Sequence, residues 1–232
     1  MPRIGTRGAS AGPGGGSGAS PRRDPRVPHI KHKLPYQEAA RELLRTSVLD
    51  AMRELLTERD WSKITLGDVA AKAGVSRQTL YNEFGSRSGL AQAYALRLAD
   101  DLVDHVDAAI TGNVGDVRAA FREGMTNFFV DAAADPLVQS LLAGEVKLDL
   151  LRLITLDAGP LLDHATGRLS LAFQHSWVAA TAAESDVIAH ALVRIALSYI
   201  PTPPGPGRDA PGELSQLLSP YVEAILAARI EH

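Results

Sequence analysis

The sequence has 232 residues, of which 45% are hydrophobic and 22% are charged, an ordinary composition for a globular protein. It contains no cysteine, which excludes disulfides, thiolate metal sites and cysteine nucleophiles. No apolar run approaches the roughly 20 residues that cross a bilayer. The amino terminus lacks the apolar core of a secretory signal, so we expect a cytoplasmic protein.

The net charge of −3 is distributed unevenly along the chain. Residues 1–35 carry seven basic residues and one acidic residue, residues 36–89 carry eight of each, and residues 90–232 carry nine basic and eighteen acidic residues. A basic end and an acidic larger part are typical of a nucleic-acid-binding end and a separate regulatory end. We therefore do not expect the acidic part to touch DNA.

Residues 1–35 are rich in Gly, Pro, Ser and Arg and have almost no apolar content. Such a segment cannot bury enough surface to fold, so we expect a disordered basic arm. The arm could add nonspecific attraction for phosphate or could simply be a solvated tail. His29 and His32 have no third ligand nearby, so the sequence predicts no metal site.

Two short helical patterns lie on either side of Gly74 within residues 64–90. Thr65 and Ser76 are good N-caps for them, and Asp68 stands at capping-box spacing from Thr65. Gly74 is the residue best able to adopt a left-handed turn. This pattern predicts a helix-turn-helix, although a capped hairpin with a merely solvated polar face gives the same local signals.

The second of these helices has one apolar face and one polar face. Leu80 and Phe84 lie one turn apart and are expected to face inward. The opposite face then carries Gln78, Thr79 and Asn82, flanked by Arg77 and Tyr81. Gln and Asn match adenine in the major groove, and Arg matches guanine or phosphate.

The remaining periodicity predicts helices and no strands. A first helix from about residue 37 to 60 precedes Trp61 and Ile64, which we expect to fill a small core beneath the two short helices. Further helices are predicted at about 86–110, 117–134, 137–142, 146–157, 161–180, 185–199 and 213–230, with a loop at 201–212. The sequence thus predicts an all-α protein of about nine helices, divided into residues 1–35, a DNA-binding domain at 36–85 and a larger domain at 86–232.

The order of these parts resembles the TetR family of bacterial transcriptional regulators. The similarity lies in TLGDVAAKAGVSRQTLYNEFGSRSGL, which follows the family pattern of Thr, I/V-A-x-x-A-G-V-S, T-L/I-Y-x-x-F, a small residue, Ser and a basic residue. It covers about residues 37–95. The run QTLYNEFGSRSGLAQAYALRLADDLVDHVDAAI is also similar to an actinobacterial subgroup tied to alkane and fatty-acid metabolism, the AlkX-type regulators.

The resemblance implies roles for individual residues of the helix-turn-helix. Phosphate contacts are implied for Thr65, Tyr81 and Arg87. The base-reading set, together with the capping serine, is implied to be Ser76, Arg77, Gln78, Thr79 and Asn82. Glu83 stands where a basic residue or His is common, so we expect its carboxylate to point away from the phosphates.

The resemblance also implies that the middle helices enclose a ligand pocket and that the last two helices form a four-helix bundle in a dimer. The implied pocket residues are Phe121, Met125, Phe128, Phe129, Leu141, Leu148, Phe173, Gln174 and Trp177. The implied dimer contacts are Val187, Ala191, Ile195, Ser198, Leu217, Tyr221, Ala224, Ile225 and Ala228. Few charges occur on these faces, which favours an apolar effector such as a fatty acid, acyl ester or alkane. Plain core packing remains an alternative for each pocket residue.

These features predict a repressor that binds a palindromic operator in double-stranded DNA as a homodimer and is released by a small apolar ligand. No cofactor besides that ligand and no membrane insertion are expected. Two alternatives stay open, namely a body that only dimerises and an activator. An enzyme is the remote alternative, because G-x-S-x-G, G-x-x-x-x-G-K-[ST] and H-E-x-x-H motifs are absent from the sequence. No catalytic residue is assigned.

Overall fold

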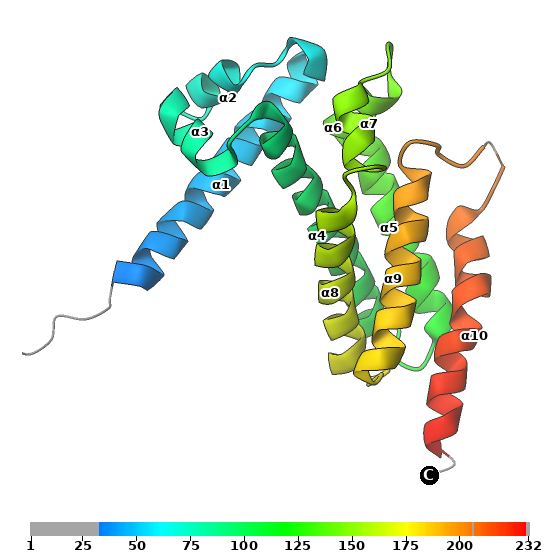
Figure 1. Ribbon diagram of the computed structural model, residues 1–232. Coiled ribbons are helices and arrows are strands. Elements are labelled where there is room, and N and C mark those ends of the chain that lie inside the picture. Colours follow the sequence, from blue (N-terminus) through cyan, green and yellow to red (C-terminus); the bar gives the residue numbers. More distant parts are fainter. Residues whose placement is uncertain (1–32, 206, 231–232) are drawn as a thin grey trace, which may run out of the picture.

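The computed structural model describes residues 33–205 and 207–230, and every regular element within them is helical (Figure 1). The first part comprises α1 (Lys33–Glu58), the 3₁₀-helix η1 (Trp61–Lys63), α2 (Leu66–Lys72) and α3 (Arg77–Phe84). The rest comprises α4 (Arg87–Gly112), α5 (Val117–Ala134), α6 (Pro136–Leu142), α7 (Leu148–Leu153), α8 (Gly159–His175), α9 (Ala182–Tyr199) and α10 (Ala210–Ile230). The predicted all-α fold is confirmed, with ten α-helices in the described residues against about nine expected. None of these helices is long and apolar enough to cross a membrane.

Helices α1, α2 and α3 and the first turns of α4 form a small unit, which we call the head. Trp61 and Ile64 are 1% and 2% exposed and lie in its core with Met52, Val69 and Leu80. This confirms the expected place of Trp61 and Ile64 beneath the two short helices. The amino-terminal half of α1 is mostly exposed and projects beyond α3 (Figure 1).

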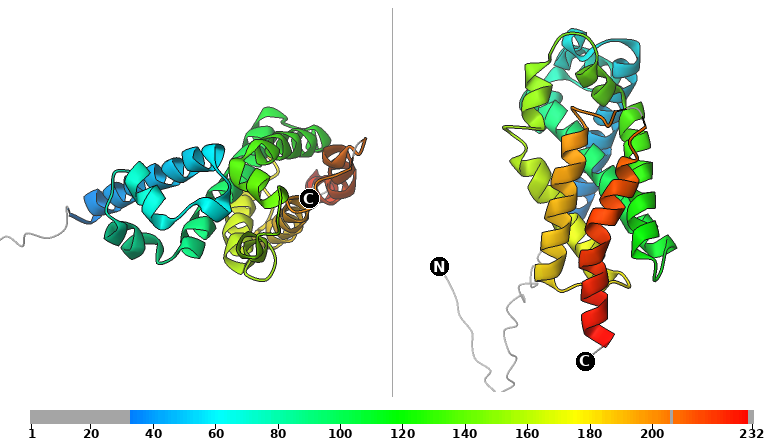
Figure 2. Two further views of the ribbon diagram at one scale, coloured as in Figure 1. Left: turned by 90° about the horizontal axis from the view of Figure 1, so that it is seen from above. Right: turned by 90° about the vertical axis from the view of Figure 1, so that its right-hand side faces the viewer.

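Helices α5 to α10, with the rest of α4, form a larger helical unit, which we call the body. Helix α4 runs from the head into the body, where it packs mainly against α5 and α8. Helix α8 packs on α9, and α10 packs on α5. Helices α9 and α10 run side by side in opposite directions along one face of the body (Figure 2). The body core is apolar and includes Met125, Leu169 and Leu192, each fully buried.

Several predicted boundaries are wrong. Helix α1 begins at Lys33, inside the segment expected to be a disordered arm, whereas residues 1–32 of that segment lie outside the described residues. Helix α8 ends at His175, five residues early, because the chain turns through Ser176–Thr181. Helix α10 begins at Ala210, within the predicted loop, where Asp209 accepts from the backbone N–H of Gly212 at 3.0 Å and so stabilises its first turn.

Candidate nucleic-acid interface and ligand cavity

Local capping contacts set the geometry of α2 and α3. The Thr65 hydroxyl accepts from the backbone N–H of Asp68 at 3.2 Å, and the Asp68 carboxylate accepts from the backbone N–H of Thr65 at 2.9 Å. Ser76 caps α3 by accepting from the backbone N–H of Thr79 at 3.0 Å. Gly74 has a φ of +70°, the left-handed conformation that favours glycine. The predicted helix-turn-helix is therefore present, with its turn at the expected residue.

The polar face of α3 points away from the head. Leu80 and Phe84 are 1% and 8% exposed, so they hold the helix against the core. On the opposite face the Gln78 amide nitrogen donates to the Asn82 amide oxygen at 2.8 Å, and both side chains are exposed. Tyr81, on the flank, is 52% exposed. These side chains have the chemistry and the exposure that contacts with base edges and phosphates require.

Arg77 is folded back over the start of α2. A Cβ atom added at Gly67 would lie 2.7 Å from a terminal guanidinium nitrogen of Arg77, so Gly67 makes room for this side chain. Arg77, Thr65 and Tyr81 line the same open hollow. The Thr65 hydroxyl donates to Asp68 at 2.7 Å, so it would have to turn away from Asp68 to donate to a phosphate.

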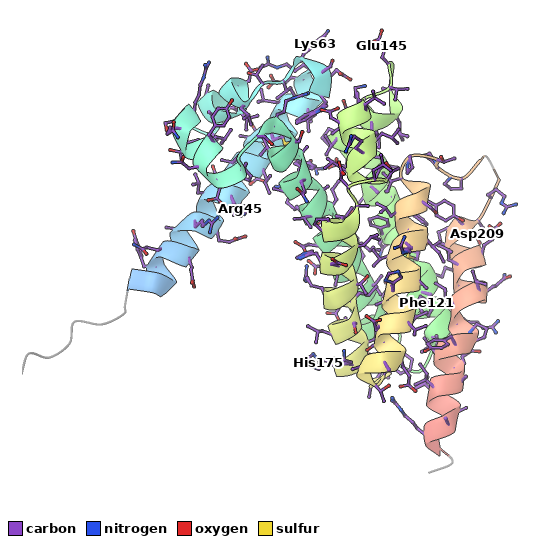
Figure 3. All side chains as sticks on the ribbon, in the orientation of Figure 1. Arg45, Lys63, Phe121, Glu145, His175 and Asp209 are labelled. Carbon is purple, nitrogen blue, oxygen red and sulfur yellow. The ribbon has the colours of Figure 1, made fainter. Side chains whose placement is uncertain are left out.

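Glu83 points back into the head. Its carboxylate is 10% exposed and accepts from Arg41 at 2.8 Å and from Arg45, both on α1. Figure 3 labels Arg45 on that helix. Burial alone would raise the pKa of Glu83, but the hydrogen bonds from the two arginines outweigh it and lower the pKa. The expectation that Glu83 faces away from a phosphate backbone is confirmed, and its ion pairs tie α3 to α1.

Arg87 does not extend freely toward solvent as a phosphate contact would. Its Nε donates to the backbone oxygen of Ile64 at 3.0 Å, and its two terminal nitrogens donate to Asp149 at 3.1 Å and to the backbone oxygen of Trp61. The guanidinium carbon lies 3.9 Å from the centre of the Trp61 ring. In this conformation Arg87 joins the head to α7, and its contact with a DNA phosphate stays a prediction.

A polar seam connects the head to helices α6 and α7. Trp61 donates from its backbone N–H to Ser140 at 3.0 Å and from its indole N–H to Asp149 at 2.7 Å. The Lys147 ammonium lies 3.0 Å from the Asp60 carboxylate. Hydrogen bonds from Ser62, Lys147 and Ser140 hold the pKa of Asp60 well below its usual range.

A second connection lies where α5 meets α6. Asp135 is 1% exposed and caps α6, accepting from the backbone N–H of Leu137 at 2.8 Å. Its carboxylate also accepts from the Tyr94 hydroxyl at 2.8 Å and from Arg53 of α1 at 2.7 Å. Burial and the neighbouring Asp135 carboxylate raise the pKa of Tyr94, so the hydroxyl remains a donor. The start of α6 is therefore bonded directly to the head.

The body contains an apolar cavity of about 70 Å³ lined by α4, α5, α6, α8 and α9 and by the residues that follow α7 and α9. Its lining consists of Ala95, Leu98, Ala99, Leu102, Phe128, Ala132, Val138, Ile154, Leu161, Ala165, Val193, Ala196, Leu197 and Ile200. Phe128 is the one residue that this lining shares with the predicted pocket set. The alanines were missed because a search for large apolar side chains passes over small ones. Alanine beside leucine on one helix face is the signal that could have located the space.

The other predicted pocket residues lie elsewhere. Phe121, Phe173 and Trp177 surround a separate gap of about 10 Å³ at the far end of the body, where Figure 3 labels Phe121. Met125 is fully buried in the core, Phe129 packs on Tyr199, and Leu141 packs against the head. Gln174 donates to the Ser170 hydroxyl at 3.1 Å, and Leu148 is 69% exposed. The structure therefore does not bring this set together as one pocket.

A polar opening adjoins the cavity between α4 and α5. It shares Leu98, Phe128 and Ala132 with the cavity lining, so the two spaces are neighbours. Its other residues are mainly acidic or basic: Arg53, Asp101, Asp104, His105, Asp131, Ala134 and Asp135. His105 and Asp131 lie 2.9 Å apart across it. This opening thus lies beside the apolar cavity and also borders Arg53 of the head.

Most of the predicted dimer residues are exposed and recur at helical spacing along α9 and α10, and we call them the exposed stripe. The two helices that carry it run side by side (Figure 2). Val187 is 56% exposed, Leu217 is 66% exposed and Tyr221 is 37% exposed, while Ser198, Ala224 and Ala228 are also exposed. Ala191 and Ile195 are half-buried. Ile225 is only 7% exposed and belongs to the interior of its own subunit, so its place in the predicted set is wrong.

Two family profiles match the chain. Residues 48–94 match the family described as bacterial regulatory proteins, tetR family, and residues 116–220 match the bacterial tetracyclin repressor, C-terminal domain. The first match contains the helix-turn-helix. The second begins just before α5 and ends within α10.

Individual relatives are similar over most of the chain. The HTH-type transcriptional regulator AlkX of Mycobacterium tuberculosis is 56% identical over 191 residues, which cover 82% of this chain and 90% of that protein. The crystal structure of the TetR family repressor AlkX from Dietzia sp. strain DQ12-45-1b, implicated in biodegradation of n-alkanes, gives a TM-score of 0.73 at 40% identity and covers 78% of this chain and 95% of that one. A TetR transcriptional regulator from Rhodococcus sp. RHA1 is similar in fold alone, with a TM-score of 0.50 at 17% identity and 82% and 97% coverage.

Proposed function

Because this chain belongs to the TetR family of bacterial transcriptional regulators, we propose that it is a repressor that binds a palindromic operator as a homodimer and is released by a small apolar ligand. The resemblance to AlkX-type regulators is confirmed by the similarity to the two AlkX proteins. The observation that carries the DNA-binding part is the exposed polar face of α3. Gln78 and Asn82 stand outward on a helix that Leu80 and Phe84 hold against the head.

The exposed stripe on α9 and α10 supports the homodimer. A two-fold axis through it would pair two copies of each helix, and small residues such as Ala224 and Ala228 would allow close approach. The two reading helices would then enter successive major grooves about 34–36 Å apart, or a multiple of that distance. A palindromic operator follows from this symmetry.

The apolar cavity of the body supports an apolar ligand. Its lining is aliphatic and aromatic, and the neighbouring opening could admit a chain from the surface. The similar AlkX repressor from Dietzia is implicated in biodegradation of n-alkanes. We therefore propose an alkane, an alkane-derived fatty acid or an acyl ester as the effector of this chain, with no further cofactor and no enzymatic turnover.

The DNA-binding proposal is tested by fluorescence anisotropy on duplexes selected from a random pool. Gln78→Ala should weaken binding to the selected site by about 1–3 kcal/mol and relax the preference at particular base pairs. Tyr81→Phe should weaken binding to all sequences alike. Gln139→Ala, which removes an exposed amide on α6, serves as the matched control. It should change neither the affinity for the selected site nor the affinity for random DNA. Equal losses for Gln78→Ala on selected and random DNA would remove Gln78 from the reading set.

The ligand proposal is tested by thermal-shift measurements with n-hexadecane, dodecanoic acid and ethyl dodecanoate. A ligand that binds the folded state raises the melting temperature, and the same compound should lower the affinity for the selected duplex. Stabilisation without any effect on DNA affinity would contradict the release mechanism. No stabilisation by any of the three would favour a body that only dimerises, and tighter DNA binding would favour an activator.

A further inference from the structure

Arg87 lies between two hollows of the head. With Thr65, Arg77 and Tyr81 it lines the open hollow beside α3, on the side where the helix-turn-helix would meet DNA. It also lines the groove between the head and the α6–α7 segment, opposite Asp149. In Figure 3 the labels Lys63, at the end of η1, and Glu145, in the loop between α6 and α7, mark the two sides of this groove. One guanidinium thus borders both the candidate DNA surface and the body.

Asp149 is the carboxylate that holds Arg87 in this position. It lies in the first turn of α7 and accepts from Arg87 at 3.1 Å and from the Trp61 indole at 2.7 Å. The remaining Arg87 bonds go to backbone oxygens of the head, and the Trp61 ring lies against the guanidinium. Asp149 is therefore the partner of Arg87 that comes from the body.

Both partners are accessible from solvent. The side chains of Arg87 and Asp149 are 35% and 36% exposed, so a phosphate oxygen can approach the same guanidinium edge. Carboxylate and phosphate oxygens accept from a guanidinium in the same geometry. A DNA phosphate near Thr65 and Tyr81 would therefore compete with Asp149 for Arg87 rather than bind beside it.

Helix α7 also reaches the apolar cavity. Ile154, the residue after α7, lines the cavity, as does Val138 of α6. One short segment thus touches the cavity at one end and holds Arg87 at the other. A ligand that displaces Ile154 would shift the end of α7, the helix that carries the carboxylate that Arg87 binds.

We propose that Asp149 is an intramolecular competitor of DNA, which restrains Arg87 from a backbone phosphate and so links the position of α7 to DNA affinity. This inference rests on the proposed function, because it requires that the head bind DNA. Arg87 then has two partners, Asp149 in the DNA-free protein and a backbone phosphate in the complex with DNA. It also makes Asp149 a positioning residue that never touches DNA.

The test uses Asp149→Asn in the full-length protein and a fluorescein-labelled duplex of mixed sequence, titrated between about 50 and 200 mM salt. The amide oxygen can still accept from Trp61, so the fold should persist, but the charge that competes with phosphate is removed. We expect an affinity increase of about two- to fivefold, the size of one exposed ion pair. We also expect the salt slope to steepen by about 0.9 for each phosphate that Arg87 gains.

Two controls separate competition from other effects. Asp157→Asn removes the same charge from the same segment, but its partner is Arg152 at 3.0 Å, so the salt slope should not change. Ser140→Ala loosens the seam without touching Arg87 and should also leave the slope unchanged. In an Arg87→Gln background, Asp149→Asn should have no effect beyond that of Asp157→Asn.

The outcomes distinguish this inference from the proposed function. If Asp149→Asn behaves like Asp157→Asn, or weakens DNA binding, the competition is refuted while the repressor proposal stands. If Ser140→Ala steepens the slope equally, the effect belongs to the seam as a whole and the inference fails. If the wild-type protein binds no duplex, the proposed function itself fails. Should Arg87→Gln melt early, Arg87→Met, which also removes the charge but keeps an unbranched side chain beside Trp61, gives the same comparison.

Discussion

Filling the apolar cavity of the body is expected to stabilise the subunit and to abolish its response to a ligand. Ala165 is fully buried on α8 and lines the cavity, so Ala165→Leu places its added methine and two methyl groups in the empty space. The cavity measures about 70 Å³. At about 24 cal/mol for each Å³ of cavity, filling it completely would contribute about 1.7 kcal/mol. Imperfect fit of the leucine makes this an upper limit.

Urea denaturation and thermal melting measure the stability of this variant. For a chain of this size, 1 kcal/mol corresponds to about 2–4 °C in melting temperature, so the full effect is about 3–7 °C. n-Hexadecane should raise the melting temperature of the wild-type protein by mass action but should leave Ala165→Leu unchanged. The DNA affinity of the variant should then be insensitive to n-hexadecane.

Ala189→Leu is the matched control for this prediction. Ala189 is also fully buried, on α9, but it lines none of the cavities described above, so the larger side chain should destabilise the protein by about 1–3 kcal/mol. If Ala165→Leu were as destabilising as this control, the space beside Ala165 could not accommodate the leucine side chain, and the prediction would be wrong. If n-hexadecane stabilised Ala165→Leu and the wild type equally, the cavity would not be the ligand site.

Three further predictions concern the head and its links to the body. Gly67→Ala places a Cβ against Arg77, so DNA affinity by anisotropy should fall several-fold, whereas urea denaturation should show an unchanged or slightly higher stability because alanine favours a helix. Glu83→Gln should lower the free energy of unfolding at neutral pH by about 1 kcal/mol. The lowered pKa of Glu83 makes its contribution present above the unfolded value of about 4.3 and lost as the pH falls through the folded value, so a pH-independent difference would contradict the ion-pair explanation. Asp135→Ala should cost about 2–4 kcal/mol, because it leaves the buried Tyr94 hydroxyl without this acceptor and α6 without its cap. Asp135→Asn should lower the free energy of unfolding by less, because the amide oxygen can still accept a hydrogen bond. Equal losses for the two variants would contradict the role of Asp135 as cap and acceptor.

The helix-turn-helix could be predicted because its signals are local. The caps at Thr65 and Ser76 and the turn at Gly74 each depend on residues within one or two turns of the chain. The inward positions of Leu80 and Phe84 follow from helix periodicity alone. The identities and spacing of these residues were therefore sufficient to predict the helix-turn-helix, and the structure places the two helices and their turn as the sequence indicates.

The role of Arg87 and the position of the cavity could not be predicted in this way. The partner of Arg87, Asp149, is 62 residues away in the sequence, and nothing in their spacing links them. The cavity depends on how closely five helices approach, which single-helix periodicity does not determine. Large aromatic side chains such as Phe121 and Phe173 were predicted to line a pocket, but large side chains fill gaps in a core. Small ones leave space.

The size of the cavity bears directly on how a ligand would reach the head. Drug-sized ligand pockets measure about 300–1,000 Å³, far more than the space of about 70 Å³ in this conformation. A long-chain effector must therefore separate the helices that enclose it. Two of the elements that would move are α6 and the end of α7, which are bonded to the head through Asp135, Ser140 and Asp149. A displacement that opens the cavity must strain or rearrange these bonds, and a coupling of about 1–3 kcal/mol is the usual scale of such a linkage. The small cavity and the polar seam are thus linked, since a ligand changes DNA affinity only if it favours one arrangement of α4, α6 and α7 relative to the head over another.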